Sequence, residues 1–145
     1  MKPILLVVAP YYQEISDMLV TGATHMIKSA GYTMEIVTVP GALEIPAAIA
    51  MAAKTERYSA FVAIGCVIRG ETSHYDIVSK ESAHALQLLA LGHHHMAIGN
   101  GILTCDTLEQ AYARADVTRG NKGGDAAIAA LRMLQLRHHF GLEYA

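Results

Sequence analysis

The sequence predicts an α/β fold: a three-layer α/β/α sandwich with a four-stranded parallel sheet. Short apolar runs rich in β-branched residues alternate along the chain with longer segments whose apolar residues recur at helical spacing. The run at 60–68 is apolar throughout, as in a strand buried on both faces of a sheet. No linker or low-complexity segment interrupts this alternation. We therefore expect one domain over residues 1–145.

The first half of the chain predicts two strand–helix units. Residues 4–9 form the first expected strand, and a helix follows it up to about residue 31. The second strand is expected at 33–39, stopped by Pro40 and Gly41. The next helix should begin near residue 44 or 45, because Pro46 suits a first helical turn, where a missing N–H costs nothing.

The second half repeats the alternation. The strand at 60–68 breaks at 69–74, and a helix then continues to Gly92. The fourth strand is expected at about 96–103. A short helix follows 104–107, and a last helix runs from residue 122 or 123 to 139.

The segment 69–74, Arg-Gly-Glu-Thr-Ser-His, joins the buried strand to its helix. Thr72 and Ser73 are natural N-cap residues, and the free N–H groups at a helix start attract anions such as phosphate. His74 lies in the first turn, and a neutral imidazole transfers protons near pH 7. We interpret His74 as the proton-transfer residue; a capping or surface histidine is the alternative.

Ligands of open α/β sheets bind beyond the carboxyl ends of the strands. Four predicted loops meet there, at 10–12, 41–44, 69–74 and 100–104. Tyr11, with Tyr12 beside it, could stack on a planar ring or serve only in packing.

Other candidate residues have ordinary explanations as well. Glu44 suits a helix start through the helix dipole. Arg114 matches a phosphate bidentately, although such an arginine is more often solvated. Lys122 lies in the glycine-rich loop 120–124, where a lysine without any functional role is common.

Composition excludes several classes of protein. The net charge of −2 gives no electrostatic reason to expect a nucleic-acid partner, and no apolar run approaches the roughly 20 residues of a membrane span. Residues 1–10 read as a strand and not as a signal peptide. Cys66, in the buried strand, and Cys105, expected in a turn, form no C-x-x-C motif, which favours a reduced, cytoplasmic setting.

Histidine clusters at 93–95 and 138–139 invite a metal interpretation. Consecutive residues point in different directions, and the sequence has no H-E-x-x-H spacing. We therefore predict no metal site.

Four motifs together resemble one family closely. VPGALEIPAAIA, GCVIRGETSHYDIV, GILTCDTLEQAYARA and GNKGGDAAIAAL occur in the order of the motifs of 6,7-dimethyl-8-ribityllumazine synthase, the penultimate enzyme of riboflavin biosynthesis. The resemblance covers nearly the whole chain. It implies condensation of 5-amino-6-ribitylaminouracil with 3,4-dihydroxy-2-butanone 4-phosphate, without a metal or organic cofactor.

The resemblance also implies residue roles. His74 would transfer protons, and a homo-oligomer, a pentamer or a multiple of pentamers, would be needed because one subunit completes the site of the next. Phosphate would be bound by Glu71, Thr72 and Arg114. The pyrimidine ring would stack on Tyr11 and meet Cys66, Val67 and Ile68 at its edge, while Ala42, Leu43 and Glu44 would line the ribityl-pyrimidine site. The residues that would reach the site from the neighbouring subunit are Asn100, Lys122 and Arg114.

Two positions depart from the family pattern. Tyr12 stands where the family commonly has an amide, and Asn100 stands where it usually has an aromatic residue. These departures motivate an alternative, a flavin- or lumazine-binding paralogue without turnover. A flavodoxin-like electron carrier is a weaker alternative, because residues 10–13 are not a Ser/Thr-rich phosphate loop.

Overall fold

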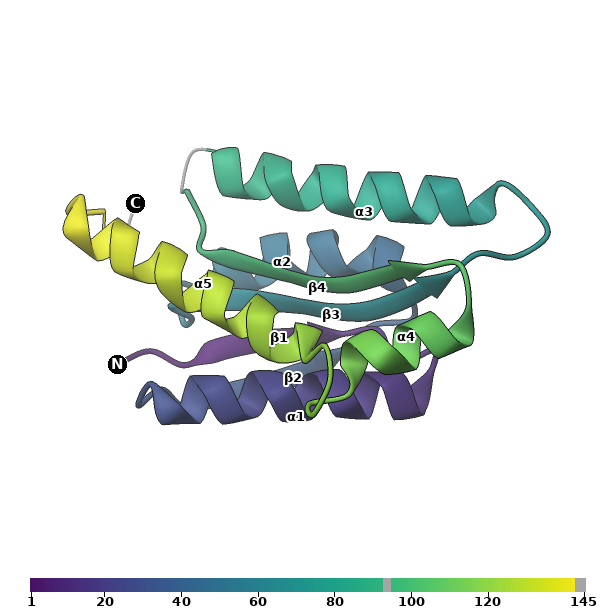
Figure 1. Ribbon diagram of the computed structural model, residues 1–145. Helices are drawn as coiled ribbons and strands as arrows, with labels where there is room; N and C mark the ends of the chain where they lie inside the picture. Colours follow the sequence, from purple (N-terminus) through teal and green to yellow (C-terminus); the bar gives the residue numbers. More distant parts are fainter. Residues whose placement is uncertain (93–94, 143–145) are drawn as a thin grey trace.

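The computed structural model describes residues 1–92 and 95–142 and contains one four-stranded sheet (Figure 1). Its strands are parallel and lie in the order β2-β1-β3-β4. In chain order the elements are β1 (Ile4–Val8), α1 (Gln13–Ser29), β2 (Met34–Thr38), the 3₁₀ helix η1 (Ala42–Glu44), α2 (Ile45–Ala53), β3 (Ala60–Ile68), α3 (His74–Leu91), β4 (Ile98–Cys105), α4 (Leu108–Ala115) and α5 (Lys122–His139). The predicted α/β fold and its parallel sheet are confirmed.

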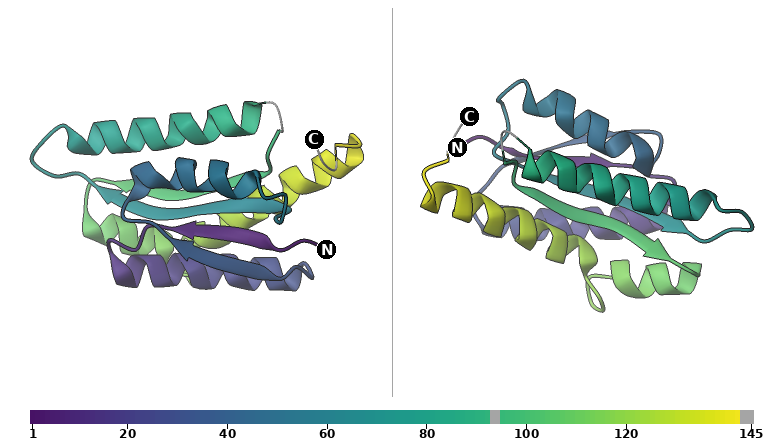
Figure 2. Two further views of the ribbon diagram at one scale, coloured as in Figure 1. Left: turned by 180° about the vertical axis from the view of Figure 1, so that it is seen from behind. Right: turned by 90° about the horizontal axis from the view of Figure 1, so that it is seen from above.

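Helices cover both faces of the sheet, which gives three layers (Figures 1 and 2). Alternate residues of β1 serve the two layers, because successive side chains of a strand point to opposite faces. Leu5 and Val7 pack with Ile45 and Ile49 of α2 on one face. Ile4, Leu6 and Val8 point to the other face, where they pack with α1, α4 and α5. Both faces of β1 and most of β3 are therefore fully buried, as their continuous apolar runs predict.

Helix α5, which begins at Lys122, packs closely against α1 and β4. A Cβ atom on Gly123 would collide with the backbone of Leu19 in α1, and one on Gly99 would collide with the backbone of Ala126. Helix α5 thus lies directly against both α1 and β4.

The boundaries of β4 differ from the prediction. The strand runs over Ile98–Cys105 and not over 96–103. The pairing of β4 with β3 extends to Ile68 opposite Cys105, and the glycines at 99 and 101 do not end the strand, because α5 packs directly over them. Cys105 is therefore the last residue of a strand and not part of a turn, and 100–104 is not a loop.

The start of α3 is also built differently from the expectation. Ser73 occupies the N-cap position but makes no side-chain cap hydrogen bond. The hydroxyl of Thr72 accepts a hydrogen bond from the N–H of His74 at 3.3 Å. Helix α2 does begin as predicted, at Ile45 with Pro46 in its first turn. Of the helices within 1–92 and 95–142, none has the length and apolar character to cross a membrane.

Candidate active site

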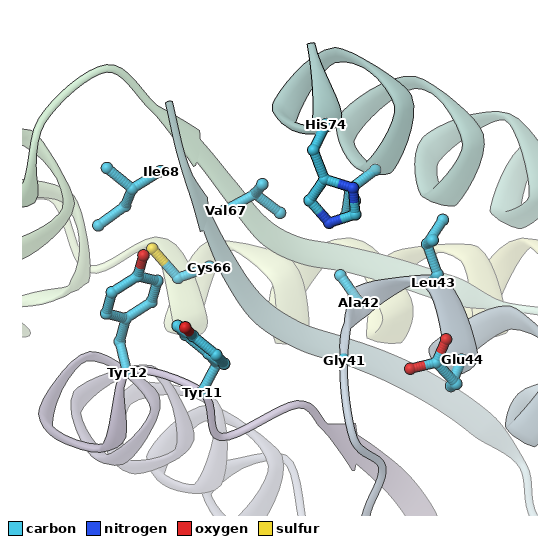
Figure 3. A pocket seen from close by; sticks show the side chains of 11 residues that line it. Tyr11, Tyr12, Gly41, Ala42, Leu43, Glu44, Cys66, Val67, Ile68 and His74 are labelled. Atoms are coloured by element: carbon cyan, nitrogen blue, oxygen red, sulfur yellow. The ribbon is translucent and has the colours of Figure 1, made fainter. Parts of the chain in front are cut away.

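A pocket of about 410 Å³ opens at the carboxyl ends of β1 and β3 (Figure 3). The starts of α1 and α3 and the short helix η1 close its sides. Most of its lining is apolar. The pocket is lined by Tyr11, Tyr12, Gly41, Ala42, Leu43, Glu44, Cys66, Val67, Ile68, His74 and Val78.

Two tyrosines form one wall of the pocket. Their rings meet edge to face, with centroids 4.9 Å apart and an interplanar angle of 73°. Tyr11 is 78% exposed, so its ring is free to stack on a flat ligand. Tyr12 is half-buried and packs partly against the core.

Tyr12 also lines the pocket, although the resemblance assigns ring stacking to Tyr11 alone. Burial raises the pKa of its hydroxyl, and the neighbouring Tyr11 and Cys66 add to the shift. Within the described part of the chain, this hydroxyl has no hydrogen-bond partner. The adjacent aromatic pair predicts ring stacking or packing, and the family pattern marks Tyr12 as the loss of an amide, but neither observation predicts a role for its hydroxyl. Its hydroxyl is a polar group in a largely apolar pocket, suited to a polar ligand edge.

The opposite wall is the turn at Gly41 and η1. Ala42 is buried, Leu43 is 40% exposed, and the N–H of Glu44 donates to the carbonyl of Gly41 at 3.1 Å. A Cβ atom on Gly41 would lie 3.2 Å from Oε1 of Glu44, so the carboxylate rests against this glycine. The turn places a carboxylate at one side of the pocket mouth (Figure 3).

His74 comes from the first residue of α3, and its imidazole points toward Val67 and Ala42 across the pocket (Figure 3). The side chain is exposed, so water and substrate can reach it. Glu71 and Thr72 lie in the exposed segment just before it and do not line the pocket.

The floor of the pocket is the end of β3. Burial, with a smaller contribution from Cys105, raises the pKa of the Cys66 thiol to about 12. Cys66 is therefore a neutral thiol at pH 7, and a thiolate nucleophile is excluded at this position.

A second hollow, of about 370 Å³, lies along β4, the end of α4 and the first half of α5, and it contains three further predicted residues. Arg114 donates to the carbonyl of Gln110 at 3.1 Å, Lys122 lies 3.4 Å from a carboxylate oxygen of Asp125, and Oδ1 of Asn100 accepts from the N–H of Ile102 at 2.9 Å. None of the three lines the pocket of His74.

The turn between α4 and α5 links Arg114, near the end of α4, to Lys122, the first residue of α5. The carboxylate of Asp116 accepts hydrogen bonds from the N–H and hydroxyl of Thr118, at 2.9 and 2.8 Å, and these lower its pKa. The N–H groups of Gly120 and Asn121 donate to backbone carbonyls of Ala113 and Asp116. The turn is thus ordered by its own hydrogen bonds.

The sequence-predicted residues therefore divide into three groups. Eight line the His74 pocket, namely Tyr11, Ala42, Leu43, Glu44, Cys66, Val67, Ile68 and His74. Asn100, Arg114 and Lys122 line the second hollow, and Glu71 and Thr72 lie in the loop before α3. In the histidine cluster at 93–95, His93 and His94 lie outside the described residues. No group of three potential metal-ligating side chains occurs within 1–92 and 95–142.

The fold and the His74 pocket are those of an α/β enzyme that binds small molecules at the carboxyl ends of its strands. The family model of 6,7-dimethyl-8-ribityllumazine synthase matches residues 2–138. The chain therefore belongs to the 6,7-dimethyl-8-ribityllumazine synthase family, which is a family of transferases.

Relatives cover nearly all of the chain. A 6,7-dimethyl-8-ribityllumazine synthase of Sphingopyxis alaskensis is 53% identical, over 98% of this chain and 99% of that protein. The 6,7-dimethyl-8-ribityllumazine synthase 1 of Rhizobium meliloti is 54% identical, over 97% and 94%. The corresponding enzyme of Bartonella henselae is 54% identical, over 95% and 90%.

Proposed function

We propose that this chain condenses 5-amino-6-ribitylaminouracil with 3,4-dihydroxy-2-butanone 4-phosphate, as the penultimate step of riboflavin biosynthesis. The products are 6,7-dimethyl-8-ribityllumazine, phosphate and water. Membership of the family, whose model matches residues 2–138, supports this reaction. The observation that carries it is a His74 imidazole aimed into a pocket that also holds an exposed aromatic ring.

The pocket suits the pyrimidine substrate. Its planar ring would stack on Tyr11, and its edge would meet the end of β3 at Cys66, Val67 and Ile68. The ribityl chain would lie along Ala42–Glu44, where the carboxylate of Glu44 can accept hydroxyl hydrogen bonds.

Proton transfer by His74 fits the steps of the reaction. The 5-amino group attacks the ketone and a first water leaves to give an imine; phosphate is then eliminated, and the ribitylamino nitrogen closes the new ring on the remaining carbonyl carbon with loss of a second water. Each step needs a proton taken from nitrogen or carbon or given to a departing oxygen, which an imidazole does well near neutral pH. Holding the two substrates together supplies much of the remaining acceleration.

The phosphate needs cations that the His74 pocket lacks. Arg114 and Lys122 supply them in the second hollow, together with Asn100, and the loop of Glu71 and Thr72 adds the amide groups of a helix start. Because these cations do not line the pocket of their own subunit, we propose that the site is completed by a neighbouring copy.

A homopentamer or a multiple of pentamers is the proposed assembly, formed by single-domain subunits. Exposed apolar side chains support a subunit contact, because a monomer in water gains by covering them. On α3 these are Ile77, Leu88 and Leu91, which are 53, 57 and 74% exposed, and Met51 of α2 is 68% exposed.

The cytoplasm is the proposed location. Cys66 and Cys105 are both free and buried, as in a protein of a reducing compartment. The proposed partners are the two small substrates and copies of this chain. The net charge of −2 offers nothing to nucleic acid.

A non-catalytic flavin- or lumazine-binding paralogue is the second candidate, favoured by Tyr12 and Asn100. A carrier has no use for an imidazole aimed into the pocket, so we rank it second.

A steady-state assay with both substrates, following lumazine absorbance above the uncatalysed condensation, tests the proposal. Saturable turnover is the expected result. Absence of turnover together with tight binding of lumazine or riboflavin, seen as fluorescence quenching, would favour the carrier. Sedimentation of the same sample reports the assembly.

A further inference from the structure

The loop that presents His74 is hydrogen-bonded at its two ends but not in its middle. Residues 69–73 extend beyond the carboxyl end of β3 before α3 begins (Figure 1). Among the described residues, none forms a hydrogen bond with Gly70 or Glu71, and a Cβ atom on Gly70 would meet nothing within 4 Å. Some other contact must hold the loop if the imidazole is to keep its place.

The side chain of Arg69 makes three contacts across this loop. Its guanidinium carbon lies 4.4 Å from the centroid of the Tyr75 ring. Its Nη1 atom lies 3.5 Å from Oδ1 of Asp76, also in the first turn of α3. The Arg69 side chain therefore contacts the two residues that directly follow His74.

The third contact reaches a different part of the sheet. Nε of Arg69 donates to Oδ1 of Asp106 at 3.0 Å, in the turn after β4. That turn is itself held, because the N–H of Asp106 donates to the side chain of Gln110 in α4 at 2.8 Å. The backbone N–H of Arg69 also donates to the carbonyl of Cys105 at 2.9 Å. One side chain thus joins the start of α3 to the ends of β3 and β4.

We infer that Arg69 is a positioning residue, which holds the start of α3 and so keeps the His74 imidazole over the pocket. This inference rests on the proposed role of His74. Arg69 itself does not line the pocket, and its guanidinium is already engaged by two carboxylates. It is thus distinct from a phosphate ligand such as Arg114. The guanidinium group suits this role because it is planar. Its face can stack on an aromatic ring while the N–H groups at its edge pair with two carboxylates.

Replacement of Arg69 should separate positioning from binding. For Arg69→Gln we expect kcat to fall roughly tenfold, because small misplacements of a reacting group have large effects on rate. The KM for the pyrimidine should stay within about twofold, since the ring contacts are intact. Arg69→Lys should recover only part of kcat, because lysine keeps one ion pair but loses the stacking and the planar guanidinium.

Arg57 provides a matched control. Its guanidinium also lies over a tyrosine ring, that of Tyr58, at 5.4 Å, and donates to the hydroxyl of Tyr58 at 3.3 Å, away from the pocket. Arg57→Gln should leave kcat unchanged. An unchanged kcat in Arg69→Gln would overturn the inference, as would an equal loss in Arg57→Gln. A raised KM for the butanone phosphate at full kcat would make Arg69 a phosphate ligand and would also overturn it.

Hydrogen exchange measures the same loop without any turnover. The amides of His74, Asp76 and Ile77, which donate hydrogen bonds at the start of α3, should exchange faster in Arg69→Gln than in the wild type or in Arg57→Gln, while those of β3 stay protected. Equal exchange in all three would refute the positioning role. The exchange experiment does not depend on the reaction. If exchange is faster in Arg69→Gln as expected but the wild type turns over no substrate, the proposed reaction is wrong, and the role of Arg69 in holding the start of α3 still stands.

Discussion

The two hollows of this chain are built on opposite principles. The His74 pocket stands at the ends of two buried strands, and apolar packing fixes most of its walls. The second hollow runs along the edge strand β4, where the hydrogen bonds of Arg114, Lys122 and Asn100 within the described residues go to groups at most four residues away in the chain. One region is shaped for a flat apolar ring and proton transfer, and the other offers exposed charge. Neither is a complete site for a phosphorylated substrate and a heterocycle together.

This contrast is tested most strongly by removing the proton-transfer group. His74→Ala should lower kcat by roughly 10²- to 10³-fold, within the range for general acid–base catalysis, and leave a residual rate from substrate positioning. His84→Ala, an exposed histidine on the same helix, is the control and should keep full activity. Steady-state kinetics with both substrates measures the effect. An unchanged rate in His74→Ala would remove this residue from the mechanism.

Removal of the charge in the second hollow should act on binding. We expect Arg114→Ala to raise the KM for the butanone phosphate by roughly tenfold or more, because a guanidinium–phosphate pair is a charge-assisted, bidentate contact. The KM for the pyrimidine should change little. Arg132 on α5, which donates to the side chain of Gln135 at 3.3 Å and does not line the second hollow, provides the control Arg132→Ala. Equal effects on the two substrates would contradict a phosphate-binding role.

The same two variants test whether the hollows belong to one shared site. Co-expression of His74→Ala and Arg114→Ala chains should restore activity, because an intact His74 on one subunit can meet an intact Arg114 on its neighbour. With random mixing, about a quarter of the sites would be intact. Activity of the mixture that stays at the average of the two variants would place both residues in one subunit's site.

Much of this architecture could be predicted from the sequence. The apolar runs identify β1 and β3, because strands buried on both faces need no polar alternation. Proline and glycine identify the start of α2. Both ends of β4 were placed two residues too early, although the predicted strand at 96–103 already ran through Gly99 and Gly101. Only the packing of α5 explains why a strand continues through them.

The site was predictable to a similar degree. The loop that leads to His74 follows from the rule that ligands bind beyond the carboxyl ends of the strands, whereas Val67 was predicted only from the resemblance to the family. The environment of the Tyr12 hydroxyl does not follow from this rule. It depends on the ring of Tyr11 and on Cys66, which is far away in the sequence. The Arg69 contacts were equally hidden, since Asp106 is 37 residues away in the chain.

Tyr12 sharpens the comparison from the pocket side. Tyr12→Phe should raise the KM for the pyrimidine by roughly tenfold or less, as expected for a single neutral hydrogen bond to the ligand. The KM for the butanone phosphate should not change. Tyr112→Phe is the control, because that hydroxyl is already engaged by Glu14, away from the pocket. Identical kinetics in Tyr12→Phe and wild type would show that the hydroxyl meets no substrate group.

Cys66 gives the smallest expected effect, which is confined to alkaline pH. The folded-state pKa of its thiol is about 12, against a usual value of 9.0. The unfolded chain therefore loses this proton above pH 9, whereas the folded chain keeps it, so the stability contributed by the buried neutral thiol is complete below pH 9 and declines as the pH rises toward 12. Relative to Cys66→Ala, the wild type should lose about 1 kcal/mol of unfolding free energy between pH 8 and pH 10, measured by urea denaturation. Parallel pH profiles for the two proteins would mean that the pocket floor is wet and the thiol titrates normally. A dry floor is what the stacking of a flat ring on Tyr11 requires, whereas the exposed cations of the second hollow need no such exclusion of water.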